Sequence, residues 1–351
     1  IVDCACHIDE DRELSQELID RGVNFYDIPF NRNPLSISNI KAFKKLIEIQ
    51  EENIYDIVHV HTPVASIYGR LLKVKFSRLK TIYTVHGFHF FEGAPILNWA
   101  IYYPIEKFMS RYTDALITIN EEDYNRAKAF KAKEVFFING VGIDLNYYDY
   151  RKFNKGKERE RLNLSNDDFV ILMIAEANKN KNIGQVIDAV EVMKSNGLDI
   201  RVLVAGDGVL LEELRKEIKD RKLQDNIKML GYRTDIRELI SVCDLGILTS
   251  YREGLPRNIM ELMAFGKPVV GTNIRGIRDL IENGKNGYLV EVGDYMQTYY
   301  ALNTLLNDEE LVKKMSQNAL DKVKKYSVNS VVEELLEVYD SEEMFTCTFD
   351  G

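Results

Sequence analysis

Short apolar runs alternate along the second half of the chain with longer segments, several of which have apolar residues every three or four positions. The apolar runs cover residues 169–175, 200–205, 227–231, 245–250 and 269–272. Continuous runs of this length are typical of parallel strands that are covered on both faces, and helices are predicted between them over residues 183–193, 235–243 and 256–265. The order strand, helix, strand predicts βαβ units and therefore an α/β domain with a parallel sheet.

The first half of the chain shows the same alternation. Strands are predicted over residues 1–6, 23–28, 56–61, 81–85, 116–119 and 134–138. Helices are predicted over residues 10–21, with Leu14, Leu18 and Ile19 facing inward, and over residues 38–51, with a buried stripe of Ile40, Phe43, Leu46 and Ile47. A charged, tyrosine-rich stretch at residues 146–165 then separates the two halves. We therefore predict one domain over residues 1–150 and a second over residues 165–326.

Composition narrows the classes of partner. The 351 residues are 45% hydrophobic, enough for two cores, and a net charge of −9 argues against nucleic-acid binding, which usually requires a basic domain. The sequence has no apolar run long enough to span a membrane and no visible signal peptide, which predicts a cytoplasmic protein. The cysteines lack metal-ligand spacing, and His59 and His61 lack a third ligand nearby, so we interpret this pair as hydrogen-bonding histidines. We expect neither a metal nor a cofactor.

Residues 251–272 place two glutamates in different backbone settings. Glu253 lies in a predicted loop, and Glu261 lies inside a predicted helix over residues 256–265. The loop after a parallel strand faces the ligand crevice of such a sheet, and the free N–H groups at a helix start attract anions. In isolation, however, Glu261 would form a solvated ion pair with Arg257, and Glu253 would only decorate a loop.

The two glutamates belong to a longer motif, E-G-L-P-x4-E-x-M-A-x-G-x-P-V-V, at residues 253–270. This motif resembles that of the retaining nucleotide-sugar glycosyltransferases of the two-domain GT-B type, family 4, and the chain looks like the surface or capsular polysaccharide subgroup. The resemblance implies an α/β fold of two Rossmann-like domains facing across a cleft, with a final helix, residues 327–340, packed back on the first domain. Family members begin with a further strand and helix, so we expect that this sequence lacks those two elements.

The resemblance also assigns roles to individual residues. Glu253 would lie against the donor sugar, and Lys181 falls on the position whose lysine neutralises the departing diphosphate. His86 falls on the position whose histidine touches the donor sugar from the first domain, so the implied catalytic residues are His86, Lys181 and Glu253. Glu261 would hydrogen-bond the ribose hydroxyls. The other implied donor-binding residues are Gly254, Leu255, Pro256, Asn258, Gly206, Gly208, Tyr232 and Arg233.

One residue departs from the family pattern. Glu176 stands where the family has an arginine, and a carboxylate cannot bind a diphosphate directly. Lys179 is a candidate substitute for that arginine, and a different role for Glu176 is the other interpretation. The alternative for Lys181 is an ordinary basic loop, and the alternative for His86 is a histidine that is hydrogen-bonded at a strand end.

Two further segments of the first half indicate an apolar or anionic partner. Residues 88–108 are rich in aromatic side chains and contain Pro95 and Pro104, which favours a surface that receives a lipid-linked acceptor, although core packing would also explain the apolar face. A basic run follows the helix that begins near residue 66. It is interpreted either as a solvated face or as a contact for anionic lipid headgroups, and it comprises Arg70, Lys73, Lys75, Arg78 and Lys80.

These features predict a retaining glycosyltransferase that moves a hexosyl or N-acetylhexosaminyl group from a nucleotide-sugar donor. The family favours a UDP-sugar, and the expected acceptor is a polyprenyl-diphosphate-linked glycan. The protein would then make peripheral contact with the inner face of the membrane during polysaccharide biosynthesis. Two alternatives stay open: a nucleotide-sugar epimerase of the same fold, and a non-catalytic, glycosyltransferase-like subunit.

Overall fold

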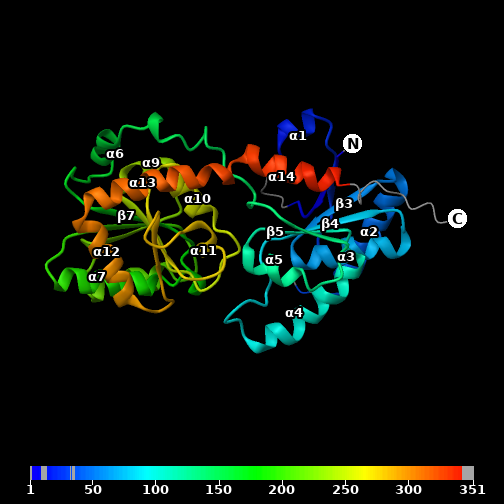
Figure 1. Ribbon diagram of the computed structural model, residues 1–351, viewed down its shortest axis with the longest axis horizontal. Coiled ribbons are helices and arrows are strands. Elements are labelled where there is room, and N and C mark those ends of the chain that lie inside the picture. Colours follow the sequence, from blue (N-terminus) through cyan, green and yellow to red (C-terminus); the bar gives the residue numbers. More distant parts are fainter. Residues whose placement is uncertain (1, 9–13, 32, 34–35, 342–351) are drawn as a thin grey trace. The chain divides into compact units, whose positions relative to one another are not determined.

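Two compact units make up the chain. The computed structural model describes residues 2–8, 14–31, 33 and 36–341. Unit 1 comprises Ile1–Phe137 and Leu336–Gly351, and unit 2 comprises Ile138–Leu335. The helix α14 (Val328–Asp340), red in Figure 1, contributes residues to both units.

The strands of unit 1 form two parallel sheets. Four strands pair in the order β3-β4-β5-β6, and their bounds are β3 (Ile57–His61), β4 (Lys80–Val85), β5 (Ala115–Thr118) and β6 (Glu134–Phe137). β1 (Cys4–Cys6) pairs separately with β2 (Phe25–Asp27). All six strands predicted for the first half are present, with ends that differ by up to three residues.

The helices of unit 1 follow the prediction less closely. The described helices are α1 (Gln16–Asp20), α2 (Ser38–Asn53), α3 (Pro63–Lys75), α4 (Ile96–Met109) and α5 (Glu121–Ala127), with the short 3₁₀ helix η1 (Ser110–Tyr112) after α4. The predicted inward face of α1 is wrong, because Leu18 and Ile19 are exposed and α1 buries no residue. The start of the predicted helix, residues 9–13, lies outside the described residues.

The buried side of α2 also differs from the predicted stripe. Ile40 is exposed, whereas the neighbouring Asn39 is fully buried. The reason is a hydrogen-bond network: the Asn39 side chain accepts a bond from the Asn31 amide at 2.7 Å and donates to the Asn33 carbonyl at 2.9 Å. Because these bonds satisfy a buried amide, the loop before α2 decides which face of the helix turns inward.

Unit 2 contains one six-stranded parallel sheet with the order β12-β11-β10-β7-β8-β9. The strands are β7 (Val170–Ile174), β8 (Arg201–Ala205), β9 (Ile227–Gly231), β10 (Leu245–Leu248), β11 (Val269–Thr272) and β12 (Gly287–Val290). Each apolar run predicted as a strand is present in this sheet. The α/β prediction with parallel sheets is thus confirmed.

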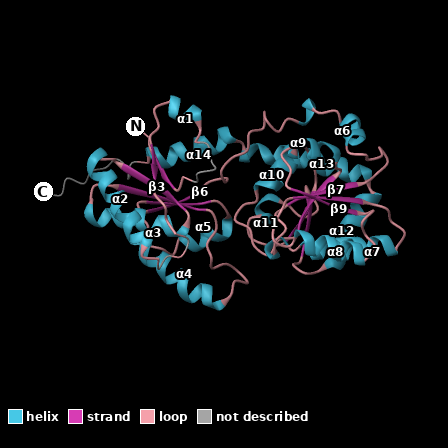
Figure 2. Ribbon diagram, turned by 180° about the vertical axis from the view of Figure 1, so that it is seen from behind, coloured by secondary structure: helices cyan, strands magenta, loops and turns pink. Residues whose placement is uncertain are grey.

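Helices cover both faces of this sheet, as Figures 1 and 2 show. One face carries α7 (Ile183–Ser195), α8 (Leu211–Asp220) and α12 (Tyr295–Asn307), and the other carries α9 (Ile236–Val242), α10 (Arg257–Ala264) and α13 (Glu309–Val323). The remaining short elements of unit 2 are η2 (Tyr150–Lys152), α6 (Lys155–Arg161), η3 (Lys179–Lys181), α11 (Ile277–Leu280) and η4 (Lys324–Tyr326). The sequence reasoning did not assign α8, although Leu211, Leu214 and Ile218 form its buried stripe.

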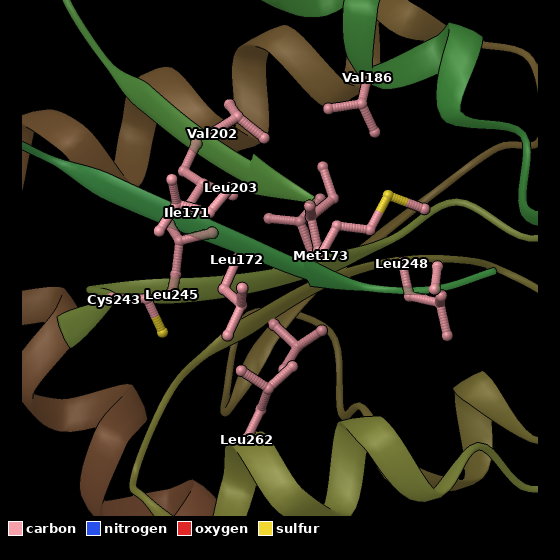
Figure 3. Close-up of a cluster of buried hydrophobic side chains, with 14 of the residues drawn as sticks. Ile171, Leu172, Met173, Val186, Val202, Leu203, Cys243, Leu245, Leu248 and Leu262 are labelled. Atoms are coloured by element: carbon pink, nitrogen blue, oxygen red, sulfur yellow. The ribbon is translucent and has the colours of Figure 1, made fainter. Parts of the chain in front are cut away.

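The core of unit 2 explains why its strands are continuous apolar runs. Figure 3 shows side chains of β7, β8 and β10 between Val186 of α7 and Leu262 of α10. Ile171 and Leu172, adjacent residues of β7, have no exposed surface although consecutive side chains of a strand point to opposite faces. Both faces of the strand are therefore buried, and every position of the run is apolar.

Candidate active site

Three loops of unit 2 leave the carboxyl edge of its sheet side by side. They follow β10, β7 and β8, which are neighbours in the sheet. β7 is the first strand of the unit. The chain adds β8 and β9 on one side of it and β10 to β12 on the other, so the strand order reverses between β7 and β10. In open parallel sheets, ligands bind outside the carboxyl ends of the strands at such a reversal.

Lys181 and Glu253 meet at this reversal, although they are 72 positions apart in the sequence. The Lys181 Nζ donates to the Glu253 Oε1 at 2.6 Å. The two side chains are 19% and 13% exposed, respectively, so the ion pair is largely withdrawn from water. Two of the three predicted catalytic residues are therefore in direct contact.

Backbone hydrogen bonds between the two loops set the positions of this pair. The Tyr251 amide donates to the Asn180 carbonyl at 2.8 Å, and the Asn180 side chain donates to the Arg252 carbonyl at 3.0 Å. The Thr249 hydroxyl donates to the Lys181 carbonyl at 3.2 Å. The loop that carries Lys181 is thus hydrogen-bonded to Thr249, Tyr251 and Arg252, which lie just before Glu253.

Asn182, the residue after Lys181, takes a backbone conformation that favours glycine. Its φ is 49° and its ψ is 46°, in the left-handed region. Asparagine tolerates this region better than other residues with a side chain. The Asn182 side chain also donates to the Gln185 Oε1 at 2.8 Å inside the first turn of α7. Asn182 therefore makes the left-handed turn that connects Lys181 to α7.

Glu261 lies on α10 with a side chain that is 12% exposed. Burial raises the pKa of Glu261, while a hydrogen bond from Tyr148 and the nearby Arg257 lower it. Arg257 and Glu261 form the i,i+4 ion pair that would explain Glu261 without a donor, with 3.3 Å between the Arg257 Nε and the Glu261 Oε1. The arginine is mostly exposed and the glutamate is not, so this is more than a solvated surface pair.

The loop before α10 packs closely against a second loop. A Cβ on Gly276 would lie 2.2 Å from the Gly254 carbonyl oxygen, so only glycine fits there. Pro256 immediately precedes the first residue of α10, and Leu255 is partly buried against the core. The Asn258 side chain donates to the Ile174 carbonyl at 2.6 Å, which fixes α10 to the end of β7. This bond gives Asn258 a structural role, and its predicted contact with the donor stays a prediction.

The two glycines after β8 lie against the loop after β7. A Cβ on Gly206 would lie 2.0 Å from the Ala175 carbonyl oxygen, and one on Gly208 would lie 2.6 Å from the Ala177 carbonyl oxygen. Their φ angles are 153° and 152°. The packing of these two loops therefore requires both glycines, and their implied contact with the donor stays a prediction.

The remaining predicted donor-binding residues lie after β9. Tyr232 is 78% exposed, which leaves its ring free to stack on a base. Arg233 donates to the Asp235 Oδ1 at 2.7 Å, so its guanidinium already has an anionic partner. Glu176, at the end of β7, is exposed, as is the neighbouring Lys179 of η3.

In unit 1, His86 belongs to a cluster of three histidines at the ends of β3 and β4. The His61 Nδ1 and the His86 Nε2 are 3.1 Å apart, and the rings of His59 and His61 stack with centroids 4.5 Å apart. His59 uses both ring nitrogens, one with the Tyr339 hydroxyl and one with the Thr84 hydroxyl, each at 2.7 Å. The prediction that His59 and His61 are hydrogen-bonded is confirmed.

The environment keeps these imidazoles neutral. Partial burial lowers the pKa of His61 and His86, and it lowers the pKa of His59 to about 3. Each histidine is therefore uncharged at neutral pH, and His86 offers a hydrogen bond instead of a charge. Among the residues that the structure describes, no three His, Cys, Asp or Glu side chains are placed to hold a metal ion.

The aromatic segment at residues 88–108 is arranged differently from the prediction. Phe88 and Phe90 are buried, and Trp99, Tyr102 and Tyr103 pack against the same core. The outward side of α4 is instead aliphatic apart from one ring, and its exposed large residues are Ile96, Leu97, Ile101, Ile105 and Phe108. The interpretation of an exposed aromatic surface is therefore wrong, because the rings fill the core and the isoleucines and leucine face out.

The basic run after residue 66 is largely neutralised. Arg70 is fully buried and donates to the Glu106 Oε2 at 3.0 Å, with its guanidinium 4.4 Å from the Tyr83 ring centroid. Lys73 pairs with Asp114, and Lys75 pairs with Glu51. Three of the five cations thus have acidic partners, so the run is not a free cationic patch for lipid headgroups.

Comparison with known proteins decides the class of this chain. Residues 154–322 match the family model described as glycosyl transferases group 1, and residues 1–120 match the model described as glycosyl transferase 4-like. EpsD from Bacillus subtilis, named as a glycosyltransferase, is 35% identical over 321 residues, which cover 90% of this chain and 84% of EpsD. The chain belongs to the glycosyltransferase family.

A second relative and two solved structures are also similar to this glycosyltransferase. The Escherichia coli UDP-Gal:alpha-D-GlcNAc-diphosphoundecaprenol alpha-1,3-galactosyltransferase is 29% identical, with 88% of this chain and 81% of the relative covered. Anabaena HepE in complex with UDP and glucose has a TM-score of 0.79 at 20% identity, with 97% and 100% covered. WaaG, a glycosyltransferase involved in lipopolysaccharide biosynthesis, has a TM-score of 0.71 at 13% identity, with the same coverage. The fold is accordingly that of the GT-B glycosyltransferases, as predicted.

Two residues of the site were missed by the sequence reasoning. Tyr148 contacts Glu261, and it lies in a stretch that was interpreted only as a linker. Arg275 is 3% exposed and donates from its Nε to the Glu253 carbonyl at 3.1 Å. A signal for Arg275 existed, because an arginine between Ile274 and Gly276 in an apolar loop needs a partner when it is buried. No comparable signal marked Tyr148.

Proposed function

We propose that this glycosyltransferase transfers a hexosyl or N-acetylhexosaminyl group from a UDP-sugar to a polyprenyl-diphosphate-linked glycan, with retention of anomeric configuration, in surface polysaccharide biosynthesis. The observation that carries the proposal is the Lys181–Glu253 contact at the strand reversal of unit 2. A paired cation and carboxylate at this edge suit a ligand that has both a diphosphate and a polyhydroxylated sugar.

In the proposed reaction, Lys181 stabilises the diphosphate as the glycosidic bond breaks. Its ammonium exchanges the Glu253 carboxylate for phosphate oxygens when the donor binds, and Glu253 then accepts hydrogen bonds from the sugar hydroxyls. Charge stabilisation of this kind, in a site organised beforehand, is commonly the largest part of enzymatic rate enhancement. The departing phosphate accepts the proton of the acceptor hydroxyl, and His86 of unit 1 contributes a neutral hydrogen-bonding group to the sugar.

Names of the relatives support the choice of donor and acceptor. The Escherichia coli relative is named for a UDP-galactose donor and a diphosphoundecaprenol-linked acceptor, and a Campylobacter jejuni relative, 25% identical over 341 residues, is named for a diphospho-undecaprenol-linked acceptor. In this chain, Glu261 would hold the ribose, and the exposed Tyr232 would border the base. The remaining proposed donor contacts are Gly254, Leu255, Pro256, Asn258, Gly206, Gly208 and Arg233.

An acceptor carried by a lipid requires the enzyme to work at a membrane, and we place the contact on the outer side of α4. Five large apolar residues are exposed along this helix. The exposed charges of α4 and η1 are Lys107 and Arg111, whereas the acidic Glu106 is buried against Arg70. An apolar helix face flanked by cations fits the cytoplasmic, anionic face of a bilayer. Among the described residues, no helix is long and apolar enough to cross a membrane.

Vesicle binding tests the membrane contact. The full chain is sedimented with vesicles of phosphatidylcholine alone or with anionic phosphatidylglycerol added. We expect binding to the anionic vesicles. Replacement of both Ile101 and Ile105 by asparagine should lower the affinity about tenfold or more, because each replacement removes an apolar side chain that the membrane would bury. Val74→Asn, at an exposed position of α3, is the matched control. Equal binding by the double variant and the wild type would contradict the assignment to α4.

A transfer assay tests the reaction itself. The full chain is incubated with a panel of nucleotide sugars and a polyprenyl-diphosphate sugar, and nuclear magnetic resonance of the product gives the anomeric configuration. We expect retention, and loss of both transfer and donor hydrolysis in Glu253→Ala. Conversion of the donor sugar without transfer would favour an epimerase, and donor binding without turnover would favour a non-catalytic subunit. Unchanged activity in Glu253→Ala would show that the assigned site is wrong.

A further inference from the structure

Tyr148 comes from a short turn that the residues of unit 2 hold rigidly. The Ile143 amide donates to the Tyr326 carbonyl at 2.9 Å, and the Ile143 carbonyl accepts from Val328 at 3.0 Å. The Asp144 Oδ1 accepts from the Tyr147 amide at 3.0 Å, and the Asp144 carbonyl accepts from the Tyr148 amide at 3.0 Å. These bonds fix the backbone that carries Tyr148, and the five residues that make them with it lie outside the proposed donor site: Ile143, Asp144, Tyr147, Tyr326 and Val328.

The Tyr148 ring is buried, and its hydroxyl reaches the donor site. The side chain is 7% exposed, and its ring meets the Phe265 ring edge-on with centroids 6.4 Å apart. The hydroxyl donates to the Glu261 Oε1 at 2.7 Å. Arg257 approaches the same oxygen at 3.3 Å. Among the described residues, none donates a hydrogen bond to the other carboxylate oxygen, Oε2.

We infer that Tyr148 is a positioning residue that holds the Glu261 carboxylate by one oxygen and leaves the other to accept hydrogen bonds from the ribose of the donor. This inference rests on the proposed function, because it takes the ribose as the ligand of Glu261. A buried phenol loses little conformational entropy when it makes this bond, so it fixes the carboxylate more rigidly than the exposed Arg257 side chain does.

The bonds from Tyr148 and Arg257 also oppose the effect of burial on the ionisation of Glu261. A carboxylate must be ionised to accept bonds from two hydroxyls, and burial opposes ionisation by raising the pKa of Glu261. The bonds from Tyr148 and Arg257 act in the opposite direction. Removal of the Tyr148 hydroxyl therefore raises the pKa of Glu261 further. As the pH is lowered, the variant should lose ribose binding at a higher pH than the wild type does.

The test compares Tyr148→Phe with Tyr147→Phe in the full chain. Tyr147 is the adjacent residue, is half-exposed, and stacks under Arg237 with 3.8 Å from the guanidinium carbon to the ring centroid. Among the described residues, the hydroxyl that donates to Glu261 is that of Tyr148 and not that of Tyr147. Binding of UDP and of 2′,3′-dideoxyuridine diphosphate is measured by calorimetry, and the donor KM and kcat are measured from pH 5 to pH 8. Thermal unfolding shows whether each variant is folded.

We expect Tyr148→Phe to weaken UDP binding and to raise the donor KM about tenfold, since the lost bond involves a charged group, while kcat changes less than about threefold. Binding of the dideoxy analogue should not change. The acid limb of the 1/KM profile should move to higher pH, and a Tyr148→Phe, Glu261→Gln double variant should bind no more weakly than Glu261→Gln. Tyr147→Phe should behave as the wild type.

Three results would overturn the inference. Equal UDP affinity in Tyr148→Phe and the wild type would refute the positioning role while the proposed function stands. An equal loss for UDP and the dideoxy analogue would show that Tyr148 acts on the fold of unit 2 and not on the ribose. If the wild type binds no nucleotide diphosphate from a panel of bases, the proposed function fails, and the positioning role fails with it.

Discussion

Replacement of Lys181 by alanine tests the centre of the site most directly. The substitution removes the cation that we assign to the diphosphate and leaves Glu253 without its partner at 2.6 Å. Loss of one well-placed group that stabilises developing charge lowers kcat by about 10²–10³-fold. We expect a fall of this size in Lys181→Ala at saturating donor, with a smaller change in donor KM.

The same substitution should also destabilise unit 2 by an amount that the burial of the pair sets. Exposed ion pairs contribute about 0–1 kcal/mol, and removal of one partner from a fully buried pair costs about 3–5 kcal/mol. The side chains here are 19% and 13% exposed, between these limits. We therefore expect a loss of about 1–3 kcal/mol in the free energy of unfolding, measured by urea denaturation at neutral pH.

Lys179 supplies the matched control for Lys181. It lies in the same 3₁₀ turn, η3, and is exposed. Lys179→Ala should keep kcat within about threefold, because a surface charge contributes little to a site that it does not contact. A full loss of activity in Lys179→Ala with a mild effect in Lys181→Ala would refute the assignment and indicate that Lys179 serves the diphosphate.

Three further variants test the structure around the sites. Gly206→Ala should destabilise unit 2 by about 3 kcal/mol or more, because its Cβ would lie 2.0 Å from the Ala175 carbonyl oxygen. Gly184→Ala in α7 is the control: its Cβ meets open space, so it should be neutral or stabilising by about 0.5–1 kcal/mol. Urea denaturation measures the free energy of unfolding of both variants. Because burial lowers the pKa of His59 to about 3, unfolding exposes an imidazole that takes up protons below about pH 6.5. The stability of the wild type should therefore fall as pH drops from about 6.5 towards 3, and His59→Gln should be less stable at neutral pH but show a flatter dependence on pH in thermal unfolding. An equal slope in both proteins would contradict the assignment to His59.

The sheet of unit 2 could be predicted from the sequence because each of its central strands is buried on both faces. Such a strand has no polar position, as the consecutive buried residues Ile171 and Leu172 show, and its run of apolar residues stands out. Helix faces at the surface of unit 1 were harder to predict. In α2, the polar Asn39 is buried and the apolar Ile40 is exposed, because the amide of Asn39 is held by a loop whose conformation has no periodic signal.

Sequence motifs located the charged residues of the site but not the groups that position them. Lys181 and Glu253 were indicated by the resemblance to the glycosyltransferase family, and each follows a predicted strand of the same sheet. The contact between Tyr148 and Glu261 joins residues 113 positions apart, and it depends on a turn whose geometry comes from long-range backbone bonds. Positioning residues such as Tyr148 lie in irregular segments, where no periodic pattern or motif distinguishes them from their neighbours.

The orientation of α4 shows how one buried charge settles an ambiguity that periodicity leaves open. Apolar residues lie all round this helix, so its sequence does not say which side faces the core. Glu106 is its only acidic residue, and it is buried because Arg70 of α3 donates to it at 3.0 Å. Rotation of α4 to bury its aliphatic side would bring Glu106 to the surface and leave the buried Arg70 without its acidic partner, which costs about 3–5 kcal/mol. The ion pair therefore keeps the aliphatic side of α4 exposed to water, and an exposed apolar patch of this kind commonly marks an interaction site, which supports the membrane contact proposed for α4.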